Sequence, residues 1–248
     1  MKLGIIGVGH LAEALLKGLA RHGAPDVILS PRGKGPALAR AMGLDLAADN
    51  EALVRESDAV LLAVRPADAP EALAGLPWRQ DQLLLSACAG VPIAALARAA
   101  PPVQVIRLMP ILAAQYGASP TLVYPMQPAL APLLDAWGSS IALDDEAQFE
   151  TATTSAAIFG WVQALIGASA DWSAANGLPE RQARRLQAET FRAAAIMLRE
   201  SDTPVPELLD SIATPGGITE AGLSHLRGAG VEDAWREACA LVLRRLRG

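Results

Sequence analysis

The sequence contains few aromatic residues, few cysteines and no block of basic residues. Aromatic side chains make up only 4% of its 248 residues, so alanine, leucine and valine must supply most of the core. Its 21 lysines and arginines are outnumbered by 26 acidic residues, a formal charge of −5, which argues against binding to a nucleic-acid backbone. With 52% hydrophobic residues the chain is too apolar for disorder, and its length allows one large domain or two modest ones.

Cysteine and histidine are too sparse to suggest a disulfide framework or a metal site. Cys88 and Cys239 are far apart and neither belongs to a C-x-x-C pair, which is typical of buried thiols in a reducing compartment. The three histidines show no metal-ligand spacing, so no metal is expected.

Long apolar runs are also missing. The apolar residues 3–9 are interrupted by glycines and end at His10 and Glu13, unlike a signal peptide. No apolar stretch reaches the length of a membrane span. We therefore expect a soluble, cytoplasmic protein that does not associate with membranes.

The first 143 residues alternate short apolar strands with helices. The expected strands cover residues 3–8, 26–30, 58–64, 82–87, 103–108 and 121–124, and the expected helices cover residues 11–21, 36–42, 51–56, 67–74, 93–99 and 130–137. This alternation predicts an α/β fold, an N-terminal Rossmann-like domain with a doubly wound parallel sheet.

The pattern changes near Asp144. Residues 144–248 show helical periodicity and no convincing strand, which predicts an all-helical second domain. Its apolar positions exceed what about a hundred residues can bury alone, which favours a homodimer.

A glycine-rich turn follows the first expected strand. Gly7-Val8-Gly9-His10-Leu11-Ala12 matches G-x-G-x-x-A and opens the first helix, the context that a dinucleotide-binding turn requires. Gly7 makes the tight turn, Gly9 leaves room for a pyrophosphate, and Ala12 lets the helix pack against the strand. An ordinary strand-to-helix turn is the alternative.

The end of the second expected strand indicates which cofactor binds. An NAD site usually has a carboxylate there, whereas this chain has Ser30-Pro31-Arg32-Gly33-Lys34. Ser30 can donate a hydrogen bond, and Arg32 and Lys34 supply positive charge for a 2′-phosphate. The segment favours NADP(H) over NAD(H), with a solvated basic turn as the alternative.

Three later strand ends should line the nicotinamide side of the cleft, because ligands bind beyond the carboxyl ends of parallel strands. These segments are Val64-Arg65-Pro66, Ser86-Ala87-Cys88-Ala89-Gly90 and Met109-Pro110.

A Pro-Gly-Gly turn in the helical half is a candidate carboxylate site. Residues 213–223 read Ala-Thr-Pro-Gly-Gly-Ile-Thr-Glu-Ala-Gly-Leu, with Thr219 at the start of a helix. Unpaired backbone N–H groups there, with the hydroxyls of Thr214 and Thr219, could bind a carboxylate. A helix–turn–helix corner with a threonine cap is the alternative.

These motifs together resemble the pyrroline-5-carboxylate reductase family over nearly the whole chain. Residues 214–223 are similar to that family's S-P-G-G-x-T-x-x-G-L signature, and residues 106–110 are similar to its I-R-x-M-P segment. The resemblance implies reduction of a cyclic imine carboxylate, 1-pyrroline-5-carboxylate, to proline. It also implies a homodimer, or a ring of dimers, joined through the helical domain.

The resemblance assigns roles to individual residues. Thr219 would hydrogen-bond the ring nitrogen, and Thr214 would hold the substrate carboxylate with the backbone of Gly216, Gly217 and Ile218. Ser30 and Arg32 would bind the 2′-phosphate, and Arg65 stands where the family usually has lysine. The remaining expected contacts are Gly7, Gly9, His10, Leu11, Ala12, Val64, Arg65, Pro66, Ala89 and Gly90 for the cofactor, and Met109 and Ser155 for the substrate.

Two departures from the family bear on the substrate. The family's M-P-N reads Met109-Pro110-Ile111, which removes a polar group near the nicotinamide. The family's S-G-S-G-P-A segment reads Thr-Ser-Ala-Ala-Ile over residues 154–158, where only Ser155 remains alignable. A different imine substrate, or an inactive NADP-binding paralogue with a regulatory role, therefore stays open. A β-hydroxyacid dehydrogenase is disfavoured, because that class uses a catalytic lysine and no lysine follows Lys34.

Overall fold

A computed structural model describes residues 1–23 and 26–248, which form two compact units. The first unit contains residues Met1–Ala156 together with Leu243–Gly248, and the second contains Ala157–Val242. Each unit is described here by itself. The expected boundary after residue 143 stays a prediction.

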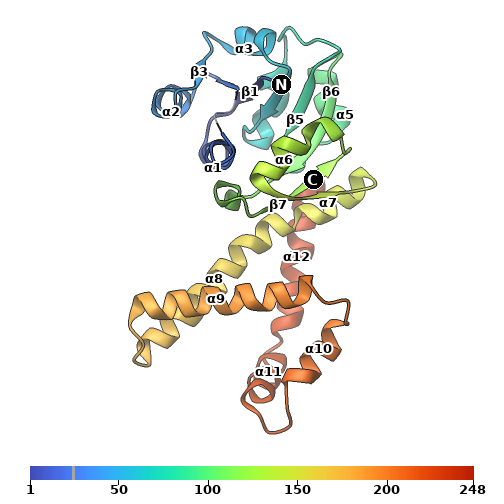
Figure 1. The fold of residues 1–248 in the computed structure, drawn as a ribbon. Coiled ribbons are helices and arrows are strands. Elements are labelled where there is room, and N and C mark those ends of the chain that lie inside the picture. The colour runs from blue at the N-terminus through green and yellow to red at the C-terminus, as the bar shows by residue number, and fades with distance from the viewer. Residues whose placement is uncertain (24–25) are drawn as a thin grey trace. The chain divides into compact units, whose positions relative to one another are not determined.

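The first unit is built on one sheet of eight strands in the order β3-β2-β1-β4-β5-β6-β7-β8 (Figure 1). The strands are β1 (Leu3–Ile6), β2 (Val27–Leu29), β3 (Asp45–Leu46), β4 (Ala59–Leu62), β5 (Leu83–Ser86), β6 (Gln104–Met109), β7 (Ser119–Tyr124) and β8 (Gly138–Ala142). All neighbouring strands are parallel except β6 and β7, which pair antiparallel. The expected Rossmann-like α/β class is thus confirmed, with one antiparallel pairing that we did not expect.

Helices follow most strands of the first unit. They are α1 (His10–Ala20), α2 (Gly35–Met42), α3 (Asn50–Glu56), α4 (Ala69–Leu73), α5 (Ile93–Ala99), α6 (Ala131–Trp137) and α7 (Glu146–Thr153), with short 3-10 turns η1 (Pro66–Asp68), η2 (Leu112–Tyr116) and η3 (Pro128–Leu130). Helices α1 to α6 match the six expected helices to within a few residues, because apolar periodicity and glycine or proline stops marked them, whereas η2 was not expected.

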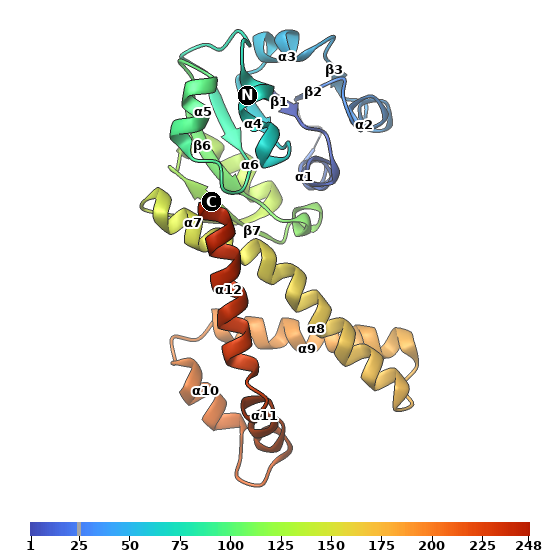
Figure 2. The same cartoon turned by 180° about the vertical axis from the view of Figure 1, so that it is seen from behind.

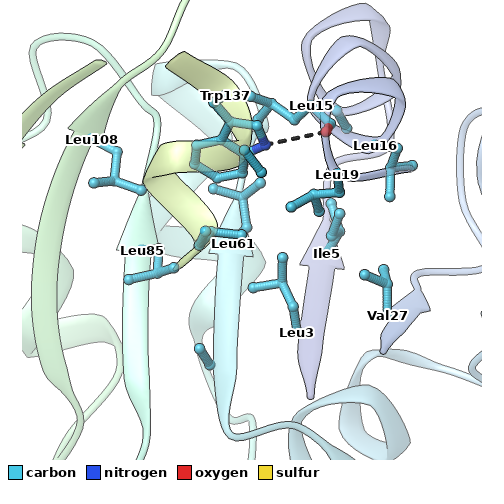
Figure 3. Packing of buried hydrophobic residues seen from close by; sticks show 14 of the residues in the cluster. Leu3, Ile5, Leu15, Leu16, Leu19, Val27, Leu61, Leu85, Leu108 and Trp137 are labelled. Atoms are coloured by element: carbon cyan, nitrogen blue, oxygen red, sulfur yellow. Dashed lines mark hydrogen bonds between the residues drawn. The ribbon is translucent and has the colours of Figure 1, made fainter. Parts of the chain in front are cut away.

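The helices cover both faces of the sheet and so create two hydrophobic clusters. One cluster joins the sheet to α1 and α6, where Trp137 is fully buried and its Nε1 donates to the carbonyl of Leu15 at 3.1 Å (Figure 3). The other joins the opposite face to α3, α4 and α5, which Figure 2 shows from behind. Its leucines include Leu53, Leu73 and Leu96. Leucine, valine and alanine make up most of both clusters, as the scarcity of aromatic residues implied.

The second unit is all-helical, as expected. Its helices are α8 (Ser155–Ala175), α9 (Glu180–Arg199), α10 (Val205–Ile212), α11 (Ile218–Gly228) and α12 (Val231–Arg247), of which α8 begins and α12 ends in the first unit. A bilayer-spanning helix would need a longer apolar stretch than any that the described helices contain.

Candidate functional site

The turn between β1 and α1 depends on its first glycine. Gly7 has a φ of 92°, and a Cβ there would lie 2.5–2.6 Å from the backbone of Ala63 and Val64, so a larger residue does not fit. Gly9 is different, because a Cβ on it would meet no atom within 4 Å. Gly9 also caps α1 without a side-chain hydrogen bond. The first N–H groups of α1 therefore lie at an unobstructed turn with a positive local potential, which suits an anion.

The start of α1 carries the other residues expected at this turn. His10 is exposed and Leu11 is half-buried, whereas Ala12 is fully buried against the sheet. Ala12 thus provides the close helix–strand packing expected of the third position in the motif.

A second turn after β2 packs on the first. The backbone N–H of Lys34 donates to the carbonyl of Val8 at 2.9 Å. Gly33 permits this close approach, since it has a φ of 61° and a Cβ on it would lie 2.9 Å from the carbonyl oxygen of Val8. Arg32 is exposed within this turn, beside the glycine-rich turn.

Ser30, which we expected to donate a hydrogen bond to the 2′-phosphate, is buried and donates within the protein. Its side chain is 1% exposed, and its Oγ donates to Oδ1 of Asn50 at 2.8 Å. Asn50 starts α3, where Asp49 supplies the cap by accepting from Ala52 N at 2.8 Å. The amide of Asn50 is therefore an additional polar group at this place. Sequence reasoning missed Asn50 as a site residue, because nothing in the local pattern linked it to Ser30.

The two cations of the Arg32–Gly35 turn differ in their partners. Lys34 Nζ lies 2.7 Å from Oε2 of Glu13, while Lys17 Nζ lies 2.8 Å from Oε1 of the same carboxylate. The hydrogen bonds from Lys17 and Lys34 lower the pKa of Glu13 to about 2. Within the described residues the Arg32 side chain has no ion pair, so Arg32 differs from Lys34 in having no carboxylate partner.

A cavity of about 620 Å³ lies between these turns and the end of β4. Its lining consists of Arg32, Asp49, Asn50, Glu51, Val64, Asp68, Glu71, Ala72, Ala74 and Leu76. Three of its four carboxylates are already engaged, at the cap of α3, with Arg55 and with Arg65. The cavity brings together Arg32 and Val64 from the expected cofactor residues, and it has the size of a small-molecule site.

The expected nicotinamide-side residues lie at one edge of the sheet. Strands β4, β5 and β6 run parallel, with Leu62 beside Ser86 and Ser86 beside Arg107, so their carboxyl ends lie at the same edge, where β6 is two residues longer. The Cys88 Sγ lies 3.5 Å from the Val64 carbonyl, which joins the ends of β4 and β5. Burial raises the pKa of the Cys88 thiol, so this cysteine is protonated at neutral pH and is no nucleophile.

Four further expected contacts differ in exposure at this edge. Arg65 is exposed and its Nε donates to Asp68 at 2.8 Å, and Pro66 begins η1. Ala89 and Gly90 are half-buried in the segment between β5 and α5. The Arg65 side chain therefore forms an ion pair within its own turn.

Met109 and Ser155, the expected substrate contacts outside the Pro-Gly-Gly turn, also belong to the first unit. Met109 ends β6 and is 7% exposed, packed against Phe149. Ser155 is exposed at the first position of α8. Ile111, two residues after Met109, is half-buried, and its backbone N–H donates to Ser119 Oγ at 3.0 Å.

The Pro-Gly-Gly turn lies in the second unit, between α10 and α11. Gly217 caps α11 without a side-chain hydrogen bond, and its own N–H donates to the Thr214 carbonyl at 2.8 Å. The N–H of Gly216 donates to Oε2 of Glu220 at 2.6 Å. Two of the backbone donors expected for the substrate carboxylate thus have internal partners, while Ile218 is 94% exposed. Sequence reasoning missed Glu220.

Within the residues that the structure describes, no group of three or more histidine, cysteine, aspartate or glutamate side chains could hold a metal ion. The donors at these turns, each within its own unit, are backbone N–H groups, hydroxyls, one amide and one arginine. Such groups bind phosphate and carboxylate oxygens.

Comparison with known families divides the chain in two. Residues 2–90 match the model described as "NADP oxidoreductase coenzyme F420-dependent", and residues 146–248 match the model of pyrroline-5-carboxylate reductase dimerisation. The two matches contain the glycine-rich turn and the Pro-Gly-Gly turn, respectively.

Individual proteins resemble the chain over its full length. Pyrroline-5-carboxylate reductase from Synechocystis is 30% identical over 258 residues, which cover 99% of this chain and 97% of that protein. The crystal structure of 1-pyrroline-5-carboxylate reductase from Streptococcus pyogenes matches with a TM-score of 0.89 and 28% identity, covering 100% of this chain and 98% of that one. The structure of the Plasmodium falciparum enzyme with NADP bound shares the fold, with a TM-score of 0.88, 24% identity and coverage of 100% and 97%. On this full-length similarity, the chain belongs to the pyrroline-5-carboxylate reductase family.

Proposed function

We propose that this protein is an NADPH-dependent reductase that converts 1-pyrroline-5-carboxylate, a cyclic imine, to proline. The observation that carries the proposal is the full-length similarity to the Synechocystis reductase, which spans both the glycine-rich turn and the Pro-Gly-Gly turn. The fold and the donors at both turns support the same reaction.

The first unit would hold the cofactor. Gly7, Gly9, His10, Leu11 and Ala12 form the turn for the pyrophosphate, where the start of α1 offers unpaired N–H groups and space over Gly9. The nicotinamide side would be lined by Val64, Arg65, Pro66, Ala89 and Gly90.

The 2′-phosphate would lie at the turn after β2. Arg32 is exposed and free of ion pairs in the described chain, and Asn50 adds an amide beside Ser30. Since no carboxylate follows β2 to repel a phosphate, the site favours NADP(H) over NAD(H).

The substrate roles follow from the family resemblance. Thr219, in the first turn of α11, would hydrogen-bond the ring nitrogen. Thr214 and the backbone of Gly216, Gly217 and Ile218 would hold the carboxylate. Met109 and Ser155 would contribute further contacts to the substrate.

The chemistry requires little covalent help from the protein. The bound cofactor would supply a hydride to the imine carbon. The chain must orient the imine, hold the proton at the ring nitrogen and exclude water. A threonine hydroxyl and backbone donors suffice for this, which agrees with the absence of an activated cysteine or lysine in the described part of the site.

The direct test mixes purified protein, NADPH and pyrroline-5-carboxylate and follows the decrease in cofactor absorbance. We expect turnover, and we expect Thr219→Val to lower kcat/KM by about 100-fold, because a hydroxyl that contacts the reacting nitrogen is lost. Turnover with other cyclic imines but none with pyrroline-5-carboxylate would assign a different substrate. Such a change is considered because Ile111 replaces the family's asparagine. Cofactor binding without oxidation against an imine panel would indicate an inactive paralogue.

We also propose that the protein is a homodimer joined through residues 146–248, the part that matches the dimerisation model. Large apolar side chains are exposed in the second unit, among them Trp172 at 69%, Leu186 at 51% and Met197 at 60%. Exposed apolar groups of this number are expected to meet a partner surface. Light scattering that gives a monomer mass at micromolar concentration would refute the dimer. The cytoplasmic location stays a prediction.

A further inference from the structure

A buried arginine in the middle of β6 contacts two glutamates of α7. Arg107 is 1% exposed, with Nη1 2.9 Å from Oε1 of Glu146 and Nη2 2.5 Å from Oε1 of Glu150. Its guanidinium carbon lies 4.5 Å from the centre of the Phe149 ring. A buried ion pair stabilises a fold little better than apolar residues of the same volume. The cluster of Arg107, Glu146 and Glu150 therefore points to a role other than stability.

Glu146 has a second partner that Glu150 lacks. The Oε1 atom of Glu146 also accepts the backbone N–H of Ile93 at 2.7 Å. Ile93 is the first residue of α5, and residues 87–92 connect it to the end of β5. Glu146 thus links α7, held by Arg107, to the segment expected beside the nicotinamide.

Phe149 contacts the same region from the same helix. It is fully buried and clusters with Met109 and Leu122, and Ala89 packs against this cluster. Helix α7 therefore packs, through Phe149, against both Ala89, after β5, and Met109, at the end of β6. Neither contact reaches the cavity near Arg32, which lies beyond β2 and β4.

We propose that Glu146 and Arg107 are positioning residues, which hold the Ala89–Ile93 segment in the conformation that binds the nicotinamide half of NADP(H). This inference rests on the proposed function. Arg107 fixes the Glu146 carboxylate, and that carboxylate fixes the N–H of Ile93. Without this bond the segment must be ordered when the cofactor binds, which lowers affinity for the nicotinamide half. The adenosine half is bound elsewhere and is unaffected.

The test compares two ligands by calorimetry on the full chain. NADP⁺ reports on both halves of the site, and adenosine 2′,5′-bisphosphate reports on the adenosine half alone. In Glu146→Ala we expect the Kd for NADP⁺ to rise about tenfold and the Kd for the bisphosphate to change less than about twofold. Glu146→Gln keeps an oxygen acceptor for Ile93 and should restore most of the NADP⁺ affinity.

Glu150→Ala is the matched control, because it removes a partner of Arg107 but leaves the Ile93 contact. It should leave the ratio of the two dissociation constants within about twofold of wild type. A second variant, Ile93→Pro, removes the N–H and leaves the ion pairs intact, at the first helical position where proline is tolerated. Compared with Ile93→Ala, Ile93→Pro should also raise the Kd for NADP⁺ without changing the Kd for the bisphosphate.

Three outcomes would overturn the inference. The first is an equal rise of the Kd for both ligands in Glu146→Ala, and the second is the same ratio of the two Kd values in Glu146→Ala and Glu150→Ala. The third is an equal Kd for NADP⁺ in the two Ile93 variants. Wild-type protein that binds neither ligand would instead refute the proposed function itself. The Ile93 pair decides the question even if Glu146→Ala does not fold.

Discussion

The Nζ atom of Lys34 lies 2.7 Å from Oε2 of Glu13, so this lysine of the turn that carries Arg32 is held in an ion pair with α1. Two cations, Arg32 and Lys34, stand at the expected 2′-phosphate site, and in the described chain Arg32 is the one without an ion pair. The discrimination between the two nicotinamide cofactors should therefore depend on Arg32.

We predict that Arg32→Ala raises the KM for NADPH by roughly 10- to 100-fold, because charge-assisted hydrogen bonds to phosphate are lost. The KM for NADH should change by less than about twofold, since NADH has no 2′-phosphate. Steady-state kinetics with both cofactors measure this. Lys34→Ala is the matched control and should raise the KM for NADPH by less than about threefold. Equal losses in the two variants would contradict the assignment.

A second prediction concerns acid stability. The pKa of Glu13 is lowered to about 2, mainly by the hydrogen bond from Lys17 and then by that from Lys34, against an ordinary value of 4.5. A carboxyl whose pKa is lower in the folded protein stabilises the fold above its unfolded pKa. This contribution is lost as the pH falls from 4.5 toward 2.

Glu13→Gln should therefore be less stable than wild type at pH 7, and the difference should shrink as the pH falls through that window. Denaturant unfolding at a series of pH values measures it. A difference that stays constant from pH 7 to below 3 would show that the ion pairs contribute nothing.

A third prediction follows from Glu220. Its carboxylate accepts the N–H of Gly216 at 2.6 Å, a donor that the proposed function assigns to the substrate carboxylate. Glu220→Ala frees this donor and removes a negative charge, so the KM for pyrroline-5-carboxylate should fall by about threefold or more, with kcat little changed. Glu220→Gln, which removes only the charge, should give an intermediate value. A higher KM in both variants would mean that Glu220 supports the turn.

Much of the fold could be predicted, because buried parallel strands are apolar throughout and end at glycine or proline. The two missed strands lack this signal. Asp45–Leu46 is two residues long and exposed, and Gly138–Ala142 is polar and mostly exposed. The antiparallel direction of β7 was also missed, although a signal existed. The nine residues between β6 and β7 are fewer than a parallel crossover requires.

The site was less predictable than the fold, because its decisive contacts join residues far apart in sequence. Ser30 contacts Asn50 twenty residues later, and Lys34 contacts Glu13 twenty-one residues earlier. Arg107 contacts Glu146 across thirty-nine residues. Periodicity and motif spacing report on local structure and neighbouring strand ends, so they identify the turns but not which charges are already paired.

The last prediction concerns Ile111, where the family has asparagine. The backbone here is held independently of the side chain, because the N–H of Ile111 donates to Ser119 Oγ, which lies 3.0 Å from Thr121 Oγ1. The side chain is half-buried, so Ile111→Asn should change the free energy of unfolding by less than about 1 kcal/mol. If pyrroline-5-carboxylate is the substrate, the restored amide should raise kcat/KM by about three- to tenfold, the effect of one hydrogen bond. Ile111→Leu is the control and should leave kcat/KM unchanged. A lower kcat/KM in Ile111→Asn at unchanged stability would mean that the pocket is adapted to a less polar imine, which an imine panel would then identify.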